Sequence, residues 1–108
     1  MLDTLGFSGF NTTLQALECG LPVVAFEGEF MRGRLASGPL RRLGLDELVA
    51  TSFDDYVDIA MRVVDDDAVR ARLRSAIAQH RRVLFNDVAP VRALEEALLA
   101  AVRDKTGE

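Results

Sequence analysis

Two short apolar runs without polar alternation lie in the first half of the chain, at residues 22–26 and 48–50. Uninterrupted runs of this kind, rich in β-branched residues, are typical of strands that are buried on both faces of a parallel sheet. Good helix formers at residues 11–19 precede the first run, with Asn11 as a candidate N-cap and Gly20 as a stop. Strands that alternate with helices through short loops predict an α/β fold for this half.

The segment between the two predicted strands contains one helix and one further helical turn. Residues 30–37 predict the helix, and the Gly-Pro pair at residues 38–39 is expected to break it. Residues 40–43 then form one more turn, which ends at Gly44. The side chains expected to face the core from the first of these helices are Phe30, Met31 and Leu35.

Residues 51–108 have the period of amphipathic helices and no further strand pattern. Three helices are predicted: one that begins with a capping box at Ser52, one from about residue 67 to 82, and one that Pro90 opens behind Asp87. Their apolar stripes are Phe53, Tyr56, Val57, Ala60 and Val64 in the first, Val69, Leu73, Ala76, Ile77 and Leu84 in the second, and Val91, Leu94, Leu98 and Val102 in the third.

Length and composition predict one globular unit. The 108 residues are 49% hydrophobic and 28% charged, enough for one core, with an α/β part at residues 1–50 and a helical part at 51–108. A formal net charge of −4 argues against a nucleic-acid-binding surface. No apolar run approaches the roughly 18 residues that cross a bilayer, so no membrane partner is expected. The single cysteine, Cys19, permits no intrachain disulfide, indicates a cytoplasmic setting and is expected to be packed.

The candidate chemistry lies at a turn with two glycines, residues 6–9, which leads directly into the helix predicted at residues 11–19. Unpaired N–H groups and the helix dipole at such a turn suit a phosphate or a diphosphate. The hydroxyls of Ser8, Thr12 and Thr13 could supply further donors. Many α/β turns carry these residue types only to cap a helix, so the pattern by itself leaves both interpretations open.

The order of these motifs resembles the nucleotide-sugar-binding half of GT-B glycosyltransferases, and most closely the O-GlcNAc-transferase-like family, whose bacterial members often follow tetratricopeptide repeats. The resemblance is in register over the first fifty residues and implies a partial Rossmann-like α/β fold, with short parallel strands followed by a helical C-terminal segment. The segments that carry it are Leu2-Asp3-Thr4 as a strand end, Gly9-Phe10-Asn11-Thr12-Thr13 as the diphosphate turn, Ala16 to Val24, Gly28-Glu29 with Arg34 and Ala36-Ser37, Leu43-Gly44 with Glu47 to Ala50, and Leu84-Phe85-Asn86.

The resemblance implies that the diphosphate turn binds a UDP-sugar through its N–H groups and hydroxyls. Two residues depart from the family pattern. Phe10 stands where the eukaryotic members have a histidine, and Gln15 stands where a carboxylate usually meets the ribose hydroxyls. A Gln amide can still accept one such hydrogen bond, without charge assistance. The donor-binding residues implied for this chain are Gly9, Phe10, Asn11, Thr12, Thr13 and Gln15.

The implied function is that of the C-terminal portion of a glycosyltransferase, which binds the diphosphate of UDP-GlcNAc or another UDP-sugar for transfer to a protein or other acceptor. No metal or other cofactor is expected. The N-terminal GT-B half, and tetratricopeptide repeats, would precede Met1, so the 108 residues alone are expected to be inactive. An unpaired strand edge would then allow a homodimer.

Two other functions remain open on these residues. One is a non-catalytic interaction module or remnant that keeps the GT-B fold, with its site weakened at Phe10 and Gln15. The other is a relative of the GT-B-fold sugar epimerases. Outside the turn, His80 is expected at the surface, and Arg34 is expected either to reach an anion near the cleft or to pair with Glu29 or Asp46.

Overall fold

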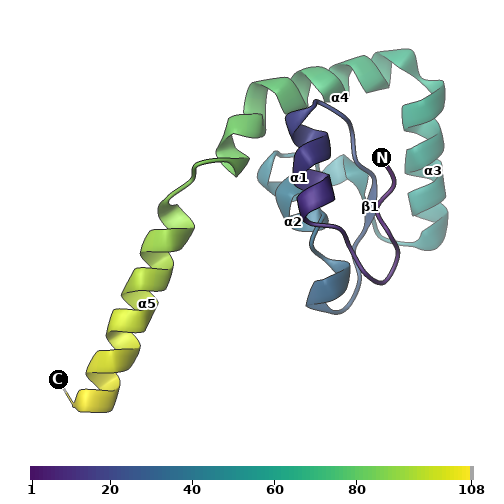
Figure 1. Ribbon diagram of the computed structural model, residues 1–108. Coiled ribbons are helices and arrows are strands. Elements are labelled where there is room, and N and C mark those ends of the chain that lie inside the picture. Colours follow the sequence, from purple (N-terminus) through teal and green to yellow (C-terminus); the bar gives the residue numbers. More distant parts are fainter. Residues whose placement is uncertain (108) are drawn as a thin grey trace.

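A two-stranded parallel sheet lies at the centre of the fold, with helices around it (Figure 1). The computed structural model describes residues 1–107. Ala25 pairs with Val49 across the sheet, and a parallel bridge joins Leu2 to Val24. The elements in chain order are α1 (Asn11–Glu18), β1 (Ala25–Phe26), a 3-10 turn (Met31–Gly33), α2 (Ser37–Arg42), a 3-10 turn (Asp46–Leu48), β2 (Val49–Ala50), α3 (Phe53–Asp65), α4 (Asp67–His80), a 3-10 turn (Arg81–Leu84) and α5 (Ala89–Thr106).

The α/β prediction is confirmed, because both apolar runs contain a strand and the two strands pair in parallel. The strands are shorter than predicted, at two residues each. Their neighbours are nevertheless buried, as expected for a sheet covered on both faces. The core consists of Ala16, Leu17, Val23, Val24, Ala25, Ala36, Leu40, Leu43, Leu45, Leu48, Val49, Ala50, Tyr56, Ile59, Leu73 and Ile77.

Two glycines end α1 and α2 where the sequence predicts a stop. Gly20 and Gly44 have φ angles of +76° and +73°, in the left-handed region. Each donates its N–H to a carbonyl of the last helical turn, as in a Schellman motif. The prediction for Cys19 is wrong: its side chain is exposed, because the residue is the C-cap of α1 at the surface.

The helix predicted at residues 30–37 is absent, and only a 3-10 turn forms there. Gly28 donates its N–H to the carbonyl of Gly33 at 2.9 Å, and the two backbones approach so closely that a Cβ at Gly33 would lie 3.2 Å from Gly28 Cα. This contact ties the segment into a loop, and Phe30 and Met31 are exposed. Instead of breaking a helix, residues 38–39 lie in the first turn of α2, where proline needs no N–H partner.

The first helix of the C-terminal half buries a face that only partly matches the predicted one, since Tyr56 is buried as predicted. Ser52 does cap α3, since its hydroxyl accepts the N–H of Asp55 at 3.0 Å. The buried side chains are Tyr56 and Ile59, however, while three residues of the predicted stripe are exposed. Those exposed residues are Phe53, Val57 and Val64. In α4 the predicted stripe is confirmed, with Leu73 and Ile77 fully buried.

The last helix, α5, points away from the rest of the molecule (Figure 1). Its predicted apolar stripe is present, but none of its residues is buried. The Cα radius of gyration is 16.9 Å, against about 13 Å for a compact domain of this length. Within residues 1–107, no helix is both long enough and apolar enough to span a bilayer.

Candidate functional site

An open hollow of about 560 Å³ lies at the N-terminus of α1. Three segments form it: Thr4, which follows the Leu2 bridge, the turn before α1, and the loop before α2. Among the residues that the structure describes, those that line the hollow are all uncharged. The lining residues are Thr4, Phe7, Ser8, Gly9, Phe10, Asn11, Thr12 and Leu35.

Asp3 organises the turn from beneath, although it does not line the hollow. Its carboxylate is buried, with only 6% of the residue exposed, and accepts the Ser8 hydroxyl at 2.5 Å and the Gly9 N–H at 2.9 Å. The Ser8 hydroxyl oxygen in turn accepts the N–H of Ala36 at 2.8 Å, from the start of α2. The Asp3 carboxylate therefore binds the turn directly and, through the Ser8 hydroxyl, reaches the loop before α2. Sequence reasoning did not assign this role to Asp3.

Tyr56 of α3 supports the same residue from the other side. Its hydroxyl donates to the main-chain oxygen of Asp3 at 2.8 Å, in a buried position. Burial raises the pKa of the Tyr56 phenol above its ordinary value, and the negative charge of Asp3 adds to the effect. The protonated phenol is therefore the form that the fold requires.

A Tyr56→Phe substitution is expected to lower the free energy of unfolding by about 1–2 kcal/mol at pH 7, because it leaves a buried carbonyl without its donor. Since the folded-state pKa of Tyr56 is raised, its contribution is complete below the ordinary pKa and falls as the pH rises above it. Urea denaturation of both proteins between neutral pH and pH about 11 checks this, since the difference between their free energies of unfolding should become smaller at alkaline pH. A difference that does not depend on pH would contradict the prediction.

The first turn of α1 presents N–H groups without protein acceptors. The N-cap is Phe10, not Asn11 as predicted, and it makes no side-chain capping bond. The first hydrogen bond of the helix runs from the Leu14 N–H to the Phe10 carbonyl, at 3.0 Å. Within residues 1–107, the N–H groups of residues 10–13 therefore have no partner and point along the axis of α1. Such a terminus attracts anions through its dipole.

The structure divides the predicted donor residues into two groups. Phe10, Asn11 and Thr12 are exposed and line the hollow, so their backbone and side-chain groups are accessible. The hydroxyls of Ser8 and Thr13 are not free donors, which corrects the sequence interpretation. Ser8 donates to Asp3, and the buried Thr13 donates to the Gly9 carbonyl at 2.7 Å.

Gly9 and Gln15 differ in their relation to the hollow. The Gly9 N–H already donates to Asp3, so this glycine shapes the turn and offers no free N–H. A Cβ at Gly9 would lie 2.5 Å from the Thr12 hydroxyl oxygen, so only glycine leaves that hydroxyl in place. Gln15 is exposed on α1, one turn beyond Asn11, and does not line the hollow.

Arg34 pairs with Glu27 at 2.8 Å, so neither of its two predicted partners holds it. Arg41 takes the contact with Asp46 instead, at 2.8 Å, and also reaches Glu27. His80 is exposed, as predicted. In the part of the chain that the structure describes, no group of three His, Cys, Asp or Glu side chains is arranged to hold a metal ion.

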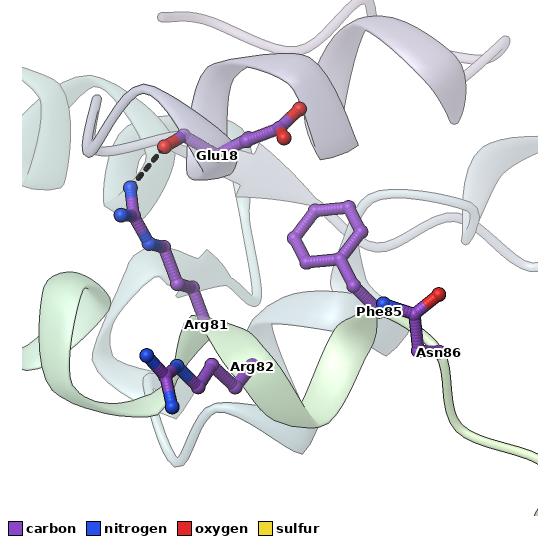
Figure 2. Close-up of a pocket in the computed structure, with 5 residues that line it drawn as sticks. All are labelled: Glu18, Arg81, Arg82, Phe85 and Asn86. Carbon is purple, nitrogen blue, oxygen red and sulfur yellow. Dashed lines mark hydrogen bonds between the residues drawn. The ribbon is translucent and has the colours of Figure 1, made fainter.

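A second hollow, of about 450 Å³, lies at the opposite end of α1 (Figure 2). There the Arg81 guanidinium donates to the main-chain oxygen of Glu18 and so caps the helix C-terminus. Phe85 faces the helix that carries Glu18, and Arg82 lies farther from that helix than Arg81 does (Figure 2). Arg81 and Arg82 bring positive charge to this hollow, but the Arg81 guanidinium already donates to the Glu18 carbonyl. The negative end of the helix dipole and the Glu18 carboxylate both oppose a bound diphosphate here. The hollow at the N-terminus is therefore the better candidate.

Comparison with known proteins points to one family. The pattern described as glycosyl transferase family 41 matches residues 1–91. The chain is 31% identical over 78 residues to the probable UDP-N-acetylglucosamine–peptide N-acetylglucosaminyltransferase SPINDLY of Petunia hybrida, covering 72% of this chain and 8% of that protein. It is 36% identical over 76 residues to the UDP-N-acetylglucosamine–peptide N-acetylglucosaminyltransferase of Caenorhabditis elegans, covering 70% of this chain and 7% of that protein.

A solved structure agrees with the sequence relatives. A mutant O-GlcNAc transferase of Thermobaculum terrenum superposes with a TM-score of 0.87 at 41% identity. The superposition covers 99% of this chain and 21% of that one. The chain thus spans less than a tenth of the curated relatives and about a fifth of the solved chain.

Proposed function

Because the chain belongs to glycosyl transferase family 41, we propose that it is the part of a peptide O-GlcNAc transferase that binds the diphosphate of the UDP-sugar donor. UDP-N-acetylglucosamine is the donor in the names of the relatives. One observation carries the proposal: residues 10–13 hold N–H groups without acceptors at the helix N-terminus, beside an open hollow. We propose a peptide as the acceptor, because the names of the relatives give one.

In the proposed reaction the turn acts on the leaving group. Negative charge develops on the departing UDP as its bond to the sugar breaks. The N–H groups of Phe10, Asn11 and Thr12, together with the dipole of α1, would stabilise that charge without moving. The lining of the hollow contains no charged side chain, so the N–H groups and the helix dipole are the anion-binding features that its lining offers. The chain alone is therefore proposed to bind UDP weakly and to transfer no sugar.

Titration of the ¹⁵N-labelled chain with UDP, followed by NMR, tests the binding directly. The amide signals of residues 10–12 are expected to shift with UDP and with pyrophosphate, but not with uridine, because the diphosphate makes the contact. Thr12→Val, which keeps the shape and removes the hydroxyl, is expected to raise the Kd for UDP about fivefold, the value of one hydrogen bond. Thr106→Val in α5 serves as the control and should leave the Kd unchanged.

Equal UDP affinity in the Thr12→Val and Thr106→Val proteins would remove the proposed role of the hydroxyl. Shifts that cluster at the Arg81 hollow instead would move the site to the other end of α1. A non-catalytic module is the second candidate, favoured by the aromatic ring of Phe10, which takes up lining area without offering a polar group. The two candidates separate when this chain replaces the matching fifth of the Thermobaculum terrenum enzyme: a chimera that binds UDP but transfers no sugar supports the module.

A further inference from the structure

The loop before α2 lies directly against the turn that precedes α1. The Ser8 N–H donates to the Arg32 carbonyl at 2.6 Å, and the Ser8 hydroxyl oxygen accepts the Ala36 N–H at 2.8 Å. Because Ser8 lines the hollow at the N-terminus of α1, these two bonds hold both ends of residues 32–36 beside that hollow. The main chain of Arg32 therefore has a fixed place at the edge of the candidate site.

The Arg32 side chain is exposed and has no carboxylate partner among residues 1–107. Its guanidinium lies over the Phe30 ring, with the Cζ atom 4.7 Å from the ring centroid. A cation–π contact at an exposed position changes an equilibrium constant only about two- to fivefold. Arg34 of the same loop differs, because Glu27 holds it in an ion pair at 2.8 Å. Arg32 is thus the cation of this loop that a ligand can draw away from its present contact.

The charges already present at the turn do not neutralise a diphosphate. A helix N-terminus is equivalent to about half a positive charge. The Asp3 carboxylate, which accepts two hydrogen bonds beneath the same turn, adds negative charge. The residues that line the hollow contribute no charged side chain. Since a diphosphate carries more than one negative charge, its binding here calls for a cation close to the turn.

Arg32 lies close enough to supply this cation. Phe10 follows Ser8 by two residues, so their Cα atoms are at most about 7 Å apart. Arg32 contacts Ser8 through its own carbonyl, and an extended arginine side chain is about as long as that separation. A change of side-chain rotamer, with the main chain held in place by Ser8, can bring the guanidinium to an anion in the hollow.

We propose that Arg32 is a further donor-binding residue: its guanidinium leaves the Phe30 ring when the donor binds, and pairs with the diphosphate at residues 10–12. The proposal rests on the proposed function, since it takes the diphosphate site as given. A guanidinium binds phosphate oxygens through two parallel hydrogen bonds, which its contact with the ring does not offer. The same pairing would stabilise the negative charge on the departing UDP.

Titration of the ¹⁵N-labelled chain with pyrophosphate, followed by NMR, tests this contact. In Arg32→Gln the Kd for pyrophosphate is expected to rise about tenfold, the effect of losing one charge-assisted contact. Arg32→Lys keeps the charge without the planar fork, so its Kd is expected to rise only about threefold. The matched control is Arg103→Gln in α5, the helix that points away from the rest of the molecule (Figure 1). It removes the same charge and should leave the Kd within about twofold of the parent value.

The side chains of Arg32 and Phe30 provide a second readout. The Arg32 Nε–H signal, identified by its absence from the Arg32→Gln spectrum, is expected to shift with pyrophosphate, because the guanidinium leaves the ring. Phe30→Leu removes the competing ring and is expected to lower the Kd about two- to fivefold. The amide spectra should show that every variant folds, because the bond from Ser8 to the Arg32 carbonyl does not depend on the side chain.

Three results would overturn the role of Arg32 and leave the diphosphate site in place. They are equal Kd values for Arg32→Gln and Arg103→Gln, an Nε–H signal that pyrophosphate does not move, and a Kd for Phe30→Leu that is unchanged or raised. In each of them the amide signals of residues 10–12 still shift. Absence of those amide shifts in the parent chain would instead remove the diphosphate site itself, and the proposal for Arg32 with it.

Discussion

Replacement of Asp3 by alanine is expected to lower the free energy of unfolding by about 3 kcal/mol and to dismantle the turn at the N-terminus of α1. The carboxylate is buried and accepts two hydrogen bonds, from the Ser8 hydroxyl and the Gly9 N–H. Hydrogen bonds to a charged group contribute about 1.5–3 kcal/mol each, and alanine leaves both donors buried without an acceptor. Urea denaturation measures the loss. Backbone NMR shifts of residues 8–13 report the change in the turn.

The matched control for Asp3→Ala is Asp104→Ala. Asp104 is exposed near the C-terminal end of α5, where a negative charge is mildly unfavourable, so its removal should change stability by less than about 0.5 kcal/mol. A double-mutant cycle with Ser8→Ala isolates the Ser8–Asp3 bond. Purely additive losses in that cycle would show that the two side chains do not act together, against the 2.5 Å contact between them.

The parts of the fold that the sequence predicts correctly depend on short-range rules. Gly20 and Gly44 end their helices because a left-handed residue is needed there, whatever the rest of the chain does. Ser52 and Asp55 likewise cap α3 through a contact three residues apart. The parallel strands follow from uninterrupted apolar runs, which are typical of a sheet covered on both faces.

The incorrect predictions concern segments whose structure depends on contacts between residues far apart in the sequence. The periodicity at residues 30–37 suits a helix, but the close approach of Gly28 and Gly33 bends this segment into a loop. In α3, Tyr56 is buried as predicted, but Ile59 is buried in place of Phe53 and Val57. The Tyr56 hydroxyl donates to the Asp3 carbonyl, 53 residues away in the sequence, a contact that the period of the helix cannot reveal.

In the candidate site too, local features are predictable from the sequence and the roles of individual side chains are not. The position of the diphosphate turn is readable in the sequence, because glycines before a helix define it locally. The different roles of Thr12 and Thr13 are not readable there, since the two threonines look equivalent in the sequence. Only the structure shows that the Thr13 hydroxyl donates to the Gly9 carbonyl while Thr12 lines the hollow.

Leu17→Ala is expected to cost about 3–4 kcal/mol of stability, as a deletion of three buried carbons with a residual cavity. Leu17 is fully buried in α1, the helix whose N-terminus forms the proposed site. Leu17 belongs to the core and does not line the hollow. Thermal and urea denaturation measure the loss.

The matched control is Leu99→Ala in α5, where the leucine is 57% exposed. The same change there should alter stability by less than about 0.5 kcal/mol, because little area is buried and alanine favours the helix.

The folded Leu17→Ala protein should keep the UDP affinity of the parent chain, because every N–H donor of residues 10–12 remains in place. The Thr12→Val variant should do the opposite: it should weaken UDP binding and leave the free energy of unfolding nearly unchanged. If Leu17→Ala weakened UDP binding as much as Thr12→Val, then packing of α1, rather than the groups at its N-terminus, would control the site.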